Sequence, residues 1–402
     1  MHTRWGIYKR FKARNFFYNE GEDDEDEEEV GDDIGAHVHT DGLDDVTMLD
    51  YAVFGERSKE VRTSERTYSF DDDIAADEMD LNRVPTMTCA PDIVTAARHS
   101  TRIATPQTCP SFFSPFGGPN TVTRLSGRTV PESSGICASR INENIIWTLN
   151  DHTNHHSLYA INSIEGSITQ YPIAKGNNYD YEDIACGPGP IPDVAYIYAA
   201  DIGDNAAKRG KRYFSGRLLI NPIIIYRIRE PNLSTLRGSD LTRWEKLKLE
   251  YPDGPHNAEA MMIDPVSERI FIISKSSGTI WMTPEQWGAG PARMTLTKVG
   301  SIKTMPDLLT GIDISPDGRE IVVKFYNSIY YFCMGNRQYD KPEDSWQDIV
   351  DVLTMDDGTK VPYIEEPQGE AVCFGQSFDD GIYTLSESQG RPLVPLIHHE
   401  RL

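Results

Sequence analysis

Residues 310–326 read TGIDISPDGREIVVKFY, and this stretch decides the fold. Two apolar runs, 311–314 and 321–326, flank the sequence Ser-Pro-Asp-Gly at 315–318. Proline presets a backbone φ of about −65°, and glycine tolerates the positive φ that a tight reversal needs. The stretch therefore predicts a β-hairpin.

The same pattern occurs four more times, with a small or acidic residue at each start. The five starts fall at 134, 182, 259, 310 and 370, so successive units are separated by 48, 77, 51 and 60 residues. Two further turns are explicit in the sequence, at 264–267 and 379–381. A third strand follows each hairpin, usually with a weaker fourth, and helical periodicity is nearly absent. Repeated four-stranded units are typical of β-propeller blades.

The sequence therefore predicts an all-β protein, a β-propeller of five blades. A sixth blade would have to lie in the long second unit. Because the chain stops soon after the third strand of the last blade, we expect a strand from 121–130 to close the ring. This places the propeller domain at 120–402, behind a mostly disordered acidic tail at 1–119. In that tail, 11 of the 14 residues from Glu20 to Asp33 are acidic, and such a run repels itself and buries no apolar surface.

The charge of the chain narrows its partners. Asp and Glu number 62 against 39 Lys and Arg, a net charge of −23. This excess of acidic residues argues against binding to nucleic acid, which requires basic side chains, and against binding to anionic membranes. No apolar stretch is long enough for a transmembrane helix. The first 19 residues are basic but lack the apolar segment of a secretion signal. They are interpreted as an ordinary basic tail, a wrongly assigned first exon or a mitochondrial presequence.

Blade geometry predicts where the chemistry lies. The first strand of each unit lines the channel and the second returns antiparallel, so first-strand starts and second-strand ends share one face, the mouth. The starts are Ser134, Glu182 with Asp183, Glu259, Thr310 and Glu370. The ends are Asn150 with Asp151, Asp201 with Asp204 and Asn205, Lys275, Lys324 with Tyr326, and Glu387. Loop residues expected on the same rim are His152, His155, His156, His256, Asp180 and Gln368.

Three glutamates at equivalent first-strand starts would repel one another unless they are protonated or neutralised. A hard cation with oxygen ligands, Ca²⁺ or Mg²⁺, is the simplest neutraliser. The predicted ligands are Glu182, Glu259, Glu370, Asp183, Asp204, Asn150 and Asp151. Two alternatives stay open: salt bridges to Lys275 and Lys324 would make the ring structural, or the acids could be spread apart and solvated.

Other motifs are weaker. The sequence Asp201-Ile-Gly-Asp-Asn205 resembles half of a calcium loop, but an ordinary turn with Gly203 at positive φ explains it equally well. Six cysteines form no metal-binding spacing. Cys89 and Cys109 could form a disulfide, and buried free thiols account for the other four. Asn232-Leu-Ser234 is a single glycosylation sequon, a motif too common to fix the compartment. No nucleophile elbow or phosphate-binding loop appears in the domain.

Several motifs together carry a family resemblance. They are Trp147-Thr-Leu-Asn-Asp, Tyr179-Asp-Tyr-Glu-Asp-Ile-Ala, Asp201-Ile-Gly-Asp-Asn, the stretch 310–318 and Gln368-Gly-Glu-Ala. Over about 131–395 the chain resembles a largely uncharacterised β-propeller family of secreted bacterial and invertebrate proteins. It is more distantly similar to esterase-like phytase propellers and, in fold alone, to calcium-dependent lactonase propellers.

The resemblance implies an extracellular propeller, although the sequence shows no signal peptide. It also suggests a hydrolase activity, which is not established for the family. The family's Asn-Asp-Ser-Gly is here Asn150-Asp151-His152-Thr153, which changes one wall of the mouth.

Two functions are compatible with these observations. The first is a non-catalytic module, a monomer that binds a small molecule, a protein or a glycan at the mouth. The alternative is a metal-dependent hydrolase of a small ester, lactone or phosphoester. In that mechanism Asp201 or His256 would act as general base, and Lys275 or Lys324 would stabilise developing negative charge.

Overall fold

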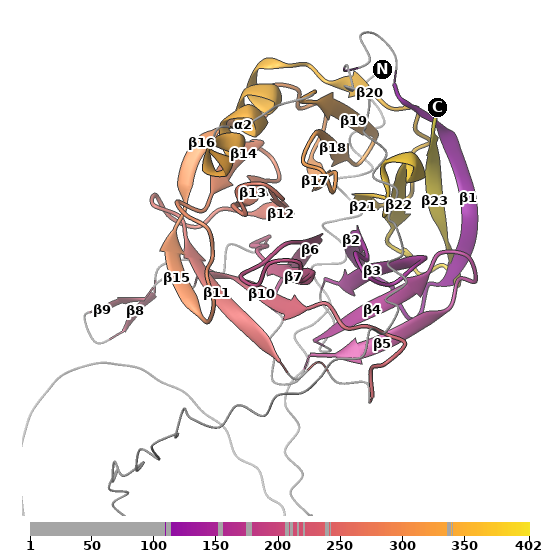
Figure 1. The fold of residues 1–402 in the computed structure, drawn as a ribbon, viewed down its shortest axis with the longest axis horizontal. Coiled ribbons are helices and arrows are strands. Elements are labelled where there is room, and N and C mark those ends of the chain that lie inside the picture. Colours follow the sequence, from indigo (N-terminus) through magenta and orange to yellow (C-terminus); the bar gives the residue numbers. More distant parts are fainter. Residues whose placement is uncertain are drawn as a thin grey trace, which may run out of the picture. The chain divides into compact units, whose positions relative to one another are not determined.

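The computed structural model describes residues 109, 114–151, 156–173, 179–205, 209, 212–214, 217–219, 222–237, 241, 243–335, 339 and 341–402. The acidic run at 20–33, most of the predicted tail, and His152 and His155 lie outside these residues. The described residues form five sheets of four or five strands arranged around a central channel, which confirms the predicted five-bladed β-propeller (Figure 1).

Each blade begins at the channel and adds strands outward. Blade 1 contains β2 (Ser133–Ala138), β3 (Ile145–Asn150), β4 (Ser157–Asn162) and β5 (Ile168–Pro172). Blade 2 contains β6 (Tyr181–Gly187), β7 (Tyr196–Asp201), β10 (Ile223–Arg229), β11 (Trp244–Glu250) and β15 (Ala292–Thr295). Blade 3 contains β12 (Ala258–Ile263), β13 (Ile270–Ser274), β14 (Thr279–Met282) and β16 (Thr297–Ser301).

Blade 4 contains β17 (Leu309–Ile314), β18 (Glu320–Phe325), β19 (Ser328–Cys333) and β20 (Thr359–Lys360). Blade 5 contains β21 (Gly369–Phe374), β22 (Ile382–Ser386), β23 (Leu393–Arg401) and, as its outermost strand, β1 (Phe116–Ser126). β1 pairs antiparallel with β23 along its length, so the start of the domain closes the ring, as the sequence predicts. The predicted segment 121–130 overlaps this strand.

Among its described residues, the long second unit holds no sixth blade. Its extra residues include a separate hairpin of β8 (Arg212–Phe214) and β9 (Arg217–Leu219), inserted between β7 and β10. Blade 2 also gains β15, which pairs in parallel with β11 at the outer edge. β15 comes from the third unit of the sequence, so the inserted hairpin is what lengthens the second unit.

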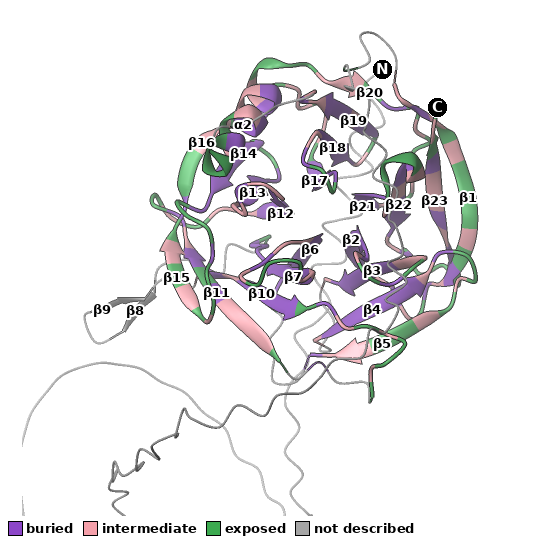
Figure 2. Cartoon of the chain, in the orientation of Figure 1, coloured by how far each residue is buried: buried purple, intermediate pink, exposed green. Residues whose placement is uncertain are grey.

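Hydrophobic packing follows the blades. The inner strands are buried, whereas the outer strands β1, β5, β15 and β16 carry most of the exposed positions (Figure 2). Among the described residues the core divides into five clusters, each between two adjacent blades. Each blade therefore buries both of its faces, and no single central core exists.

One short α-helix is present among the described residues, which agrees with the expectation that helices are nearly absent. α2 (Ser345–Met355) follows the short 3-10 turn η1 (Pro342–Asp344) and covers the outer edge of blade 3. Ile349, Val350 and Leu353 are buried in the cluster between blades 3 and 4. A second 3-10 turn, η2 (Phe378–Asp380), lies at the predicted reversal of blade 5. Among the described residues no helix is long and apolar enough to span a membrane.

Two disulfides correct the expectation for the cysteines. Cys109 pairs with Cys333 of β19, so it cannot pair with Cys89, and Cys137 of β2 pairs with Cys186 of β6. Cys373 is the buried free thiol among the described cysteines. Both bonds join segments that are distant in sequence.

Candidate functional site: an acidic channel mouth

A β-bulge at the same position of every innermost strand builds the mouth. In each first strand the register skips the second residue, so this residue has no partner on the second strand. The five skipped residues are Ser134, Glu182, Glu259, Thr310 and Glu370. All five are buried, and they are the five equivalent starts that the sequence predicts. Because a bulge re-aims the side chain at its extra residue, the repeat places one polar group per blade at one end of the channel.

The strongest acidic cluster lies on the side of blades 1 and 2. Asp151, Asp180 and Glu182 each offer a carboxylate oxygen, and the three oxygens lie within 4.8 Å of one another. Asp180 and Glu182 are buried, and Asp151 is half-buried. Burial, followed by the charges of Glu259 and Asp151, raises the pKa of Glu182 well above its usual value. We call these three residues the carboxylate trio. Sequence reasoning placed Asp180 on the rim but did not include it among the ligands.

The loop Asp201–Asn205 supports the carboxylate trio. Asn205 donates from Nδ2 to Glu182 Oε1 at 3.2 Å. A Cβ atom at Gly203 would lie 2.6 Å from Asp180 Oδ2 and still closer to Glu182 Oε1. Gly203 is not at positive φ, contrary to the sequence interpretation. Glycine is required here because the carboxylates approach its backbone closely.

Lys275 neutralises Glu259, one of the three glutamates at the bulges (Glu182, Glu259 and Glu370), which we call the ring glutamates. Its ammonium lies 2.6 Å from Glu259 Oε1, and the sequence alternative of a lysine-neutralised carboxylate is therefore realised at this position. Burial by itself would lower the pKa of Lys275, but Glu259 and the neighbouring acids raise it above its usual value, so the ammonium stays charged.

A carboxyl pair lies on the side of blade 5. Tyr326 donates to Glu370 Oε1 at 3.0 Å, and Gln368 donates to the same oxygen at 3.1 Å. Burial, and then the neighbouring charge and hydrogen bond of Glu370, raise the pKa of Glu387 to about 9. At neutral pH this raised pKa favours the protonated form of Glu387 on this side of the mouth.

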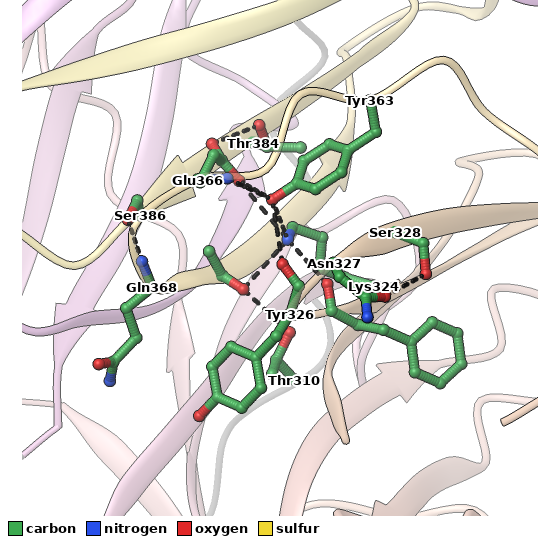
Figure 3. A network of polar contacts seen from close by, with 12 residues as sticks. Thr310, Lys324, Tyr326, Asn327, Ser328, Tyr363, Glu366, Gln368, Thr384 and Ser386 are labelled. Carbon is green, nitrogen blue, oxygen red and sulfur yellow. Dashed lines mark hydrogen bonds and ion pairs between the residues drawn. The ribbon is translucent and has the colours of Figure 1, made fainter. Parts of the chain in front are cut away.

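Lys324 lies deeper, between blades 4 and 5, and belongs to a different network (Figure 3). Its ammonium donates to Tyr363 Oη at 2.8 Å, to the Phe325 carbonyl at 3.0 Å and to the Gly369 carbonyl at 3.1 Å. Glu366 Oε2 lies 3.5 Å away. Burial lowers the pKa of Lys324. The lysine thus fastens the segment before β21 to blade 4, and its ion-pair partner is Glu366 instead of a glutamate of the ring.

Four other predicted site residues make contacts within the scaffold: Asp201, Asp204, Asn150 and His256. Asp201 pairs with Arg209 and accepts the Asp180 amide at 3.1 Å. Asp204 accepts the Arg209 amide at 3.0 Å. Asn150 accepts the Glu132 amide at 3.1 Å.

His256 bonds Asp253 at 2.8 Å and packs against the rings of Tyr251 and Trp281. Sequence reasoning missed Arg209, which pairs with Asp201. The signal that could have found it is the cluster of basic residues at 208–212, in which Arg209 lies.

Asp183 faces away from Glu182 and toward the interior of the channel. Its oxygens accept the Ile184 amide and the Met261 amide, each at 2.8 Å, so the residue ties blade 2 to blade 3. Its pKa is raised well above the usual value, chiefly by burial. These contacts describe a structural tie, and a ligand role for Asp183 stays a prediction.

Comparison with known proteins gives the fold alone. No family model and no curated protein matches the chain, so the family resemblance stays a prediction. Solved structures that match include a luciferin-regenerating enzyme, at 11% identity and a TM-score of 0.35, covering 71% of this chain and 96% of that one. The calcium-binding protein regucalcin of Agrobacterium tumefaciens matches at 11% and 0.37, covering 73% and 97%. The Cps50 (Swd1) β-propeller domain of Myceliophteria thermophila matches at 9% and 0.36, covering 70% and 99%. At these values the likeness carries no argument about function.

Proposed function

We propose that the channel mouth binds a divalent cation, Ca²⁺ in preference to Mg²⁺, and that the protein uses this mouth as a ligand-binding module. The observation that carries the proposal is the carboxylate trio, whose oxygens lie within 4.8 Å of one another and are mostly buried. Three carboxylates so close together repel one another unless protons or a cation neutralise them.

The residues present suit a hard cation. Every group of the trio offers oxygen ligands. Asn205 turns its amide nitrogen to Glu182 and its amide oxygen to Asn257, so it positions Glu182 without adding a ligand. Asp151 directly follows β3, Asp180 directly precedes β6, and Glu182 belongs to β6. Ca²⁺ accepts six to eight oxygens in flexible geometry, whereas Mg²⁺ demands a near-ideal octahedron. A set collected from separate segments therefore favours Ca²⁺.

Neighbouring charges leave room for the cation. Lys275 already pairs with Glu259, and Tyr326 and Gln368 already bond Glu370. Glu182 accepts a hydrogen bond from the neutral Asn205 amide. Glu182 is the ring glutamate whose charged neighbours are mainly acidic. All groups of the proposed site belong to one chain, so a monomer is sufficient for it. A small anionic ligand, or an acidic group of a protein or glycan, could then complete the coordination of the cation.

Calorimetric titration and thermal unfolding of the chelator-treated full chain test the cation site. We expect Ca²⁺ at about one hundred times its dissociation constant to stabilise the fold by about 2.7 kcal/mol. Glu182→Gln should abolish that gain and the heat of binding. Glu343→Gln, which removes one exposed acid outside the mouth, serves as the matched control and should behave like the parent. Equal Ca²⁺ responses in the two variants would contradict the proposal.

A second candidate function, hydrolysis of a small ester, lactone or phosphoester, is favoured by the carboxyl pair. A bound cation would polarise a substrate oxygen and lower the pKa of bound water. Glu387, with a pKa of about 9, keeps its proton at neutral pH and could donate it to a leaving group. Lys275 lies at the same mouth, where it would stabilise developing negative charge. The two candidate general bases already have partners: Asp201 pairs with Arg209, and His256 bonds Asp253.

A panel of esters, lactones and phosphoesters, assayed with Ca²⁺ or Mg²⁺, separates the two functions. Hydrolysis predicts turnover that Glu387→Gln removes while Ca²⁺ binding persists. The binding module predicts no turnover on any member of the panel, together with ligand retention that depends on Ca²⁺ and is lost in Glu182→Gln.

A further inference from the structure

The segment after β10 presents an asparagine at the surface in a fixed turn. Asn232 and Ser234 are exposed, and they belong to the only Asn-x-Ser/Thr sequence in the 402 residues. The turn itself is anchored. The Leu233 amide donates to Asn142 Oδ1 at 2.9 Å, and the Leu233 side chain packs against the core between blades 1 and 2.

The hydrogen bonds of the turn orient the asparagine side chain. Asn232 Oδ1 accepts from the Ser234 amide at 3.0 Å and from the Ser234 hydroxyl at 2.6 Å. The Asn232 carbonyl accepts the amides of Thr235 and Leu236 at 3.1 and 2.9 Å. Among the described residues the Nδ2 atom has no hydrogen-bond partner. The carboxamide thus lies against the hydroxyl of its own motif, while its nitrogen is available for reaction.

From this geometry we infer that Asn232 is an attachment site for an N-linked oligosaccharide. The donor would be an oligosaccharide carried on a lipid pyrophosphate. The Asn232 nitrogen attacks the anomeric carbon of the first sugar and a carbon–nitrogen bond forms. The bond from that carbon to the pyrophosphate oxygen breaks, the nitrogen loses one proton, and the lipid pyrophosphate leaves. No oxidant or reductant is needed.

The disulfides supply an independent argument. Cys137–Cys186 and Cys109–Cys333 are both formed, and such bonds persist in the oxidising compartments through which secreted proteins pass. Attachment of sugars to Asn-x-Ser/Thr marks a surface loop of a secreted protein. A chain that forms these disulfides is therefore in the compartment type where the modification takes place.

The position of Asn232 suits a bulky sugar. β10 runs from the mouth to the opposite face, so the turn lies on the side away from the carboxylate trio. Asn232 lines a surface cavity of about 570 Å³, whose walls include Ile141, Ile228, Leu236 and Leu241. Ile141 is 48% exposed. The cavity lining also includes the charged residues Asp193, Arg229, Glu230 and Arg243. The first sugars would cover this mixed surface and leave the mouth open, so the modification does not compete with cation binding.

Mass spectrometry of the full chain tests the inference. The chain, preceded by a cleavable secretion signal, is expressed in animal cells. Peptides from the medium and from the microsomal fraction are treated with peptide-N-glycosidase in heavy-oxygen water. We expect Asn232 to be recovered as labelled aspartate. Ser234→Thr keeps the hydroxyl and should retain the oligosaccharide, whereas Ser234→Ala should lose it completely.

Asn232→Gln gives a second loss variant that keeps Ser234. Unlabelled Asn232 in the parent chain, in both fractions, would overturn the inference. Labelling that persists in Ser234→Ala would also overturn it. The result does not depend on the cation site, because Glu182→Gln should carry the same oligosaccharide as the parent.

Discussion

Asp183 and Glu182 are adjacent residues with opposite environments. Glu182 occupies the bulge and points into the mouth, whereas Asp183 points into the channel and accepts amides of Ile184 and Met261. Gly135 of blade 1 permits this arrangement, because a Cβ atom there would lie 2.5 Å from Asp183 Oδ1. The bulge at Glu182 thus separates a candidate ligand from the structural tie at the next residue.

We expect Asp183→Ala to lower the free energy of unfolding by about 2–5 kcal/mol, because it leaves two buried amide donors without an acceptor. Asp183→Asn keeps one acceptor oxygen and should lose less. Denaturant titration measures both variants. Glu182→Gln is the comparison from the neighbouring position and should change Ca²⁺ binding more than stability. A larger loss in Asp183→Asn than in Asp183→Ala would contradict the assigned contacts.

Gly203 gives a second test at single-residue scale. A methyl group there would meet Asp180 and Glu182 and force the carboxylate trio apart. Gly203→Ala should therefore weaken Ca²⁺ binding by at least about tenfold, a change of about 1.4 kcal/mol, in calorimetric titration. Gly288→Ala is the matched control, since a Cβ atom at that glycine has open space. Unchanged affinity in Gly203→Ala would show that the trio is not the binding site.

At the scale of the element, α2 shows how the outer edge of a blade is protected. The helix packs Val350 and Thr354 near Gly300 of β16, so the short strand is covered on one side. Its apolar positions Trp346, Ile349, Val350 and Leu353 do follow helical spacing, and the sequence therefore contained a signal that the expectation of an all-β chain obscured.

Leu353 belongs to α2, and its side chain is fully buried. Leu353→Ala should destabilise the fold by about 2–5 kcal/mol, because it removes buried methyl groups and leaves a cavity. Ca²⁺ affinity should not change, since the helix lies outside the mouth. Met355→Ala, at an exposed position of the same helix, is the control and should have little effect on the denaturation midpoint. Equal midpoints for the two variants would mean that α2 does not stabilise blade 3.

At the scale of the whole molecule, ring closure brings acids of different blades together. Burial and mutual repulsion raise the pKa of Glu182 and of Glu259, and raise that of Glu387 from 4.5 to about 9. These folded-state values lie above the unfolded ones. Between about pH 5 and pH 9 the folded chain therefore holds more protons than the unfolded chain, and stability falls as pH rises.

We accordingly expect the melting temperature of the metal-free protein to decrease from about pH 6 to about pH 9. The free energy of unfolding should fall by up to about 1.4 kcal/mol per pH unit for each such group. Ca²⁺ should reverse the trend, because a cation replaces the protons and binds more tightly as they leave. Thermal melts at several pH values, with Ca²⁺ or with chelator, measure both effects. A metal-free melting temperature that rises over this range would exclude the proposed proton sharing.

The disulfides constrain the ring at the same scale. Cys109–Cys333 spans 224 residues and Cys137–Cys186 spans 49. Chain-entropy estimates give about 5 and about 4 kcal/mol for loops of these lengths. Cys109→Ser with Cys333→Ser should therefore destabilise the chain somewhat more than Cys137→Ser with Cys186→Ser, as measured by urea unfolding. Cys373→Ala breaks no disulfide and controls for loss of sulfur. No change in either pair would show that the bonds are not formed in solution.

The sequence by itself determined the five hairpins and the face that each acidic start would occupy. This was possible because strand direction alternates within a blade, so equivalent positions of a repeat meet at one end of the channel. The bulges refine that placement without changing it. The fold and the positions of Glu182, Glu259 and Glu370 follow from this local pattern, whereas the choice between five and six blades came from the sheet topology.

Only the tertiary structure decided which partners these side chains choose. Lys275 reaches Glu259, whereas Tyr326 stands at the equivalent place in the next blade, and Lys324, two residues before it, turns to Glu366 and Tyr363. Asp180 joins the carboxylate trio, and Asp201 is held by Arg209. These choices depend on distances of a few ångströms between neighbouring blades, which closure of the ring sets and spacing along the chain does not encode.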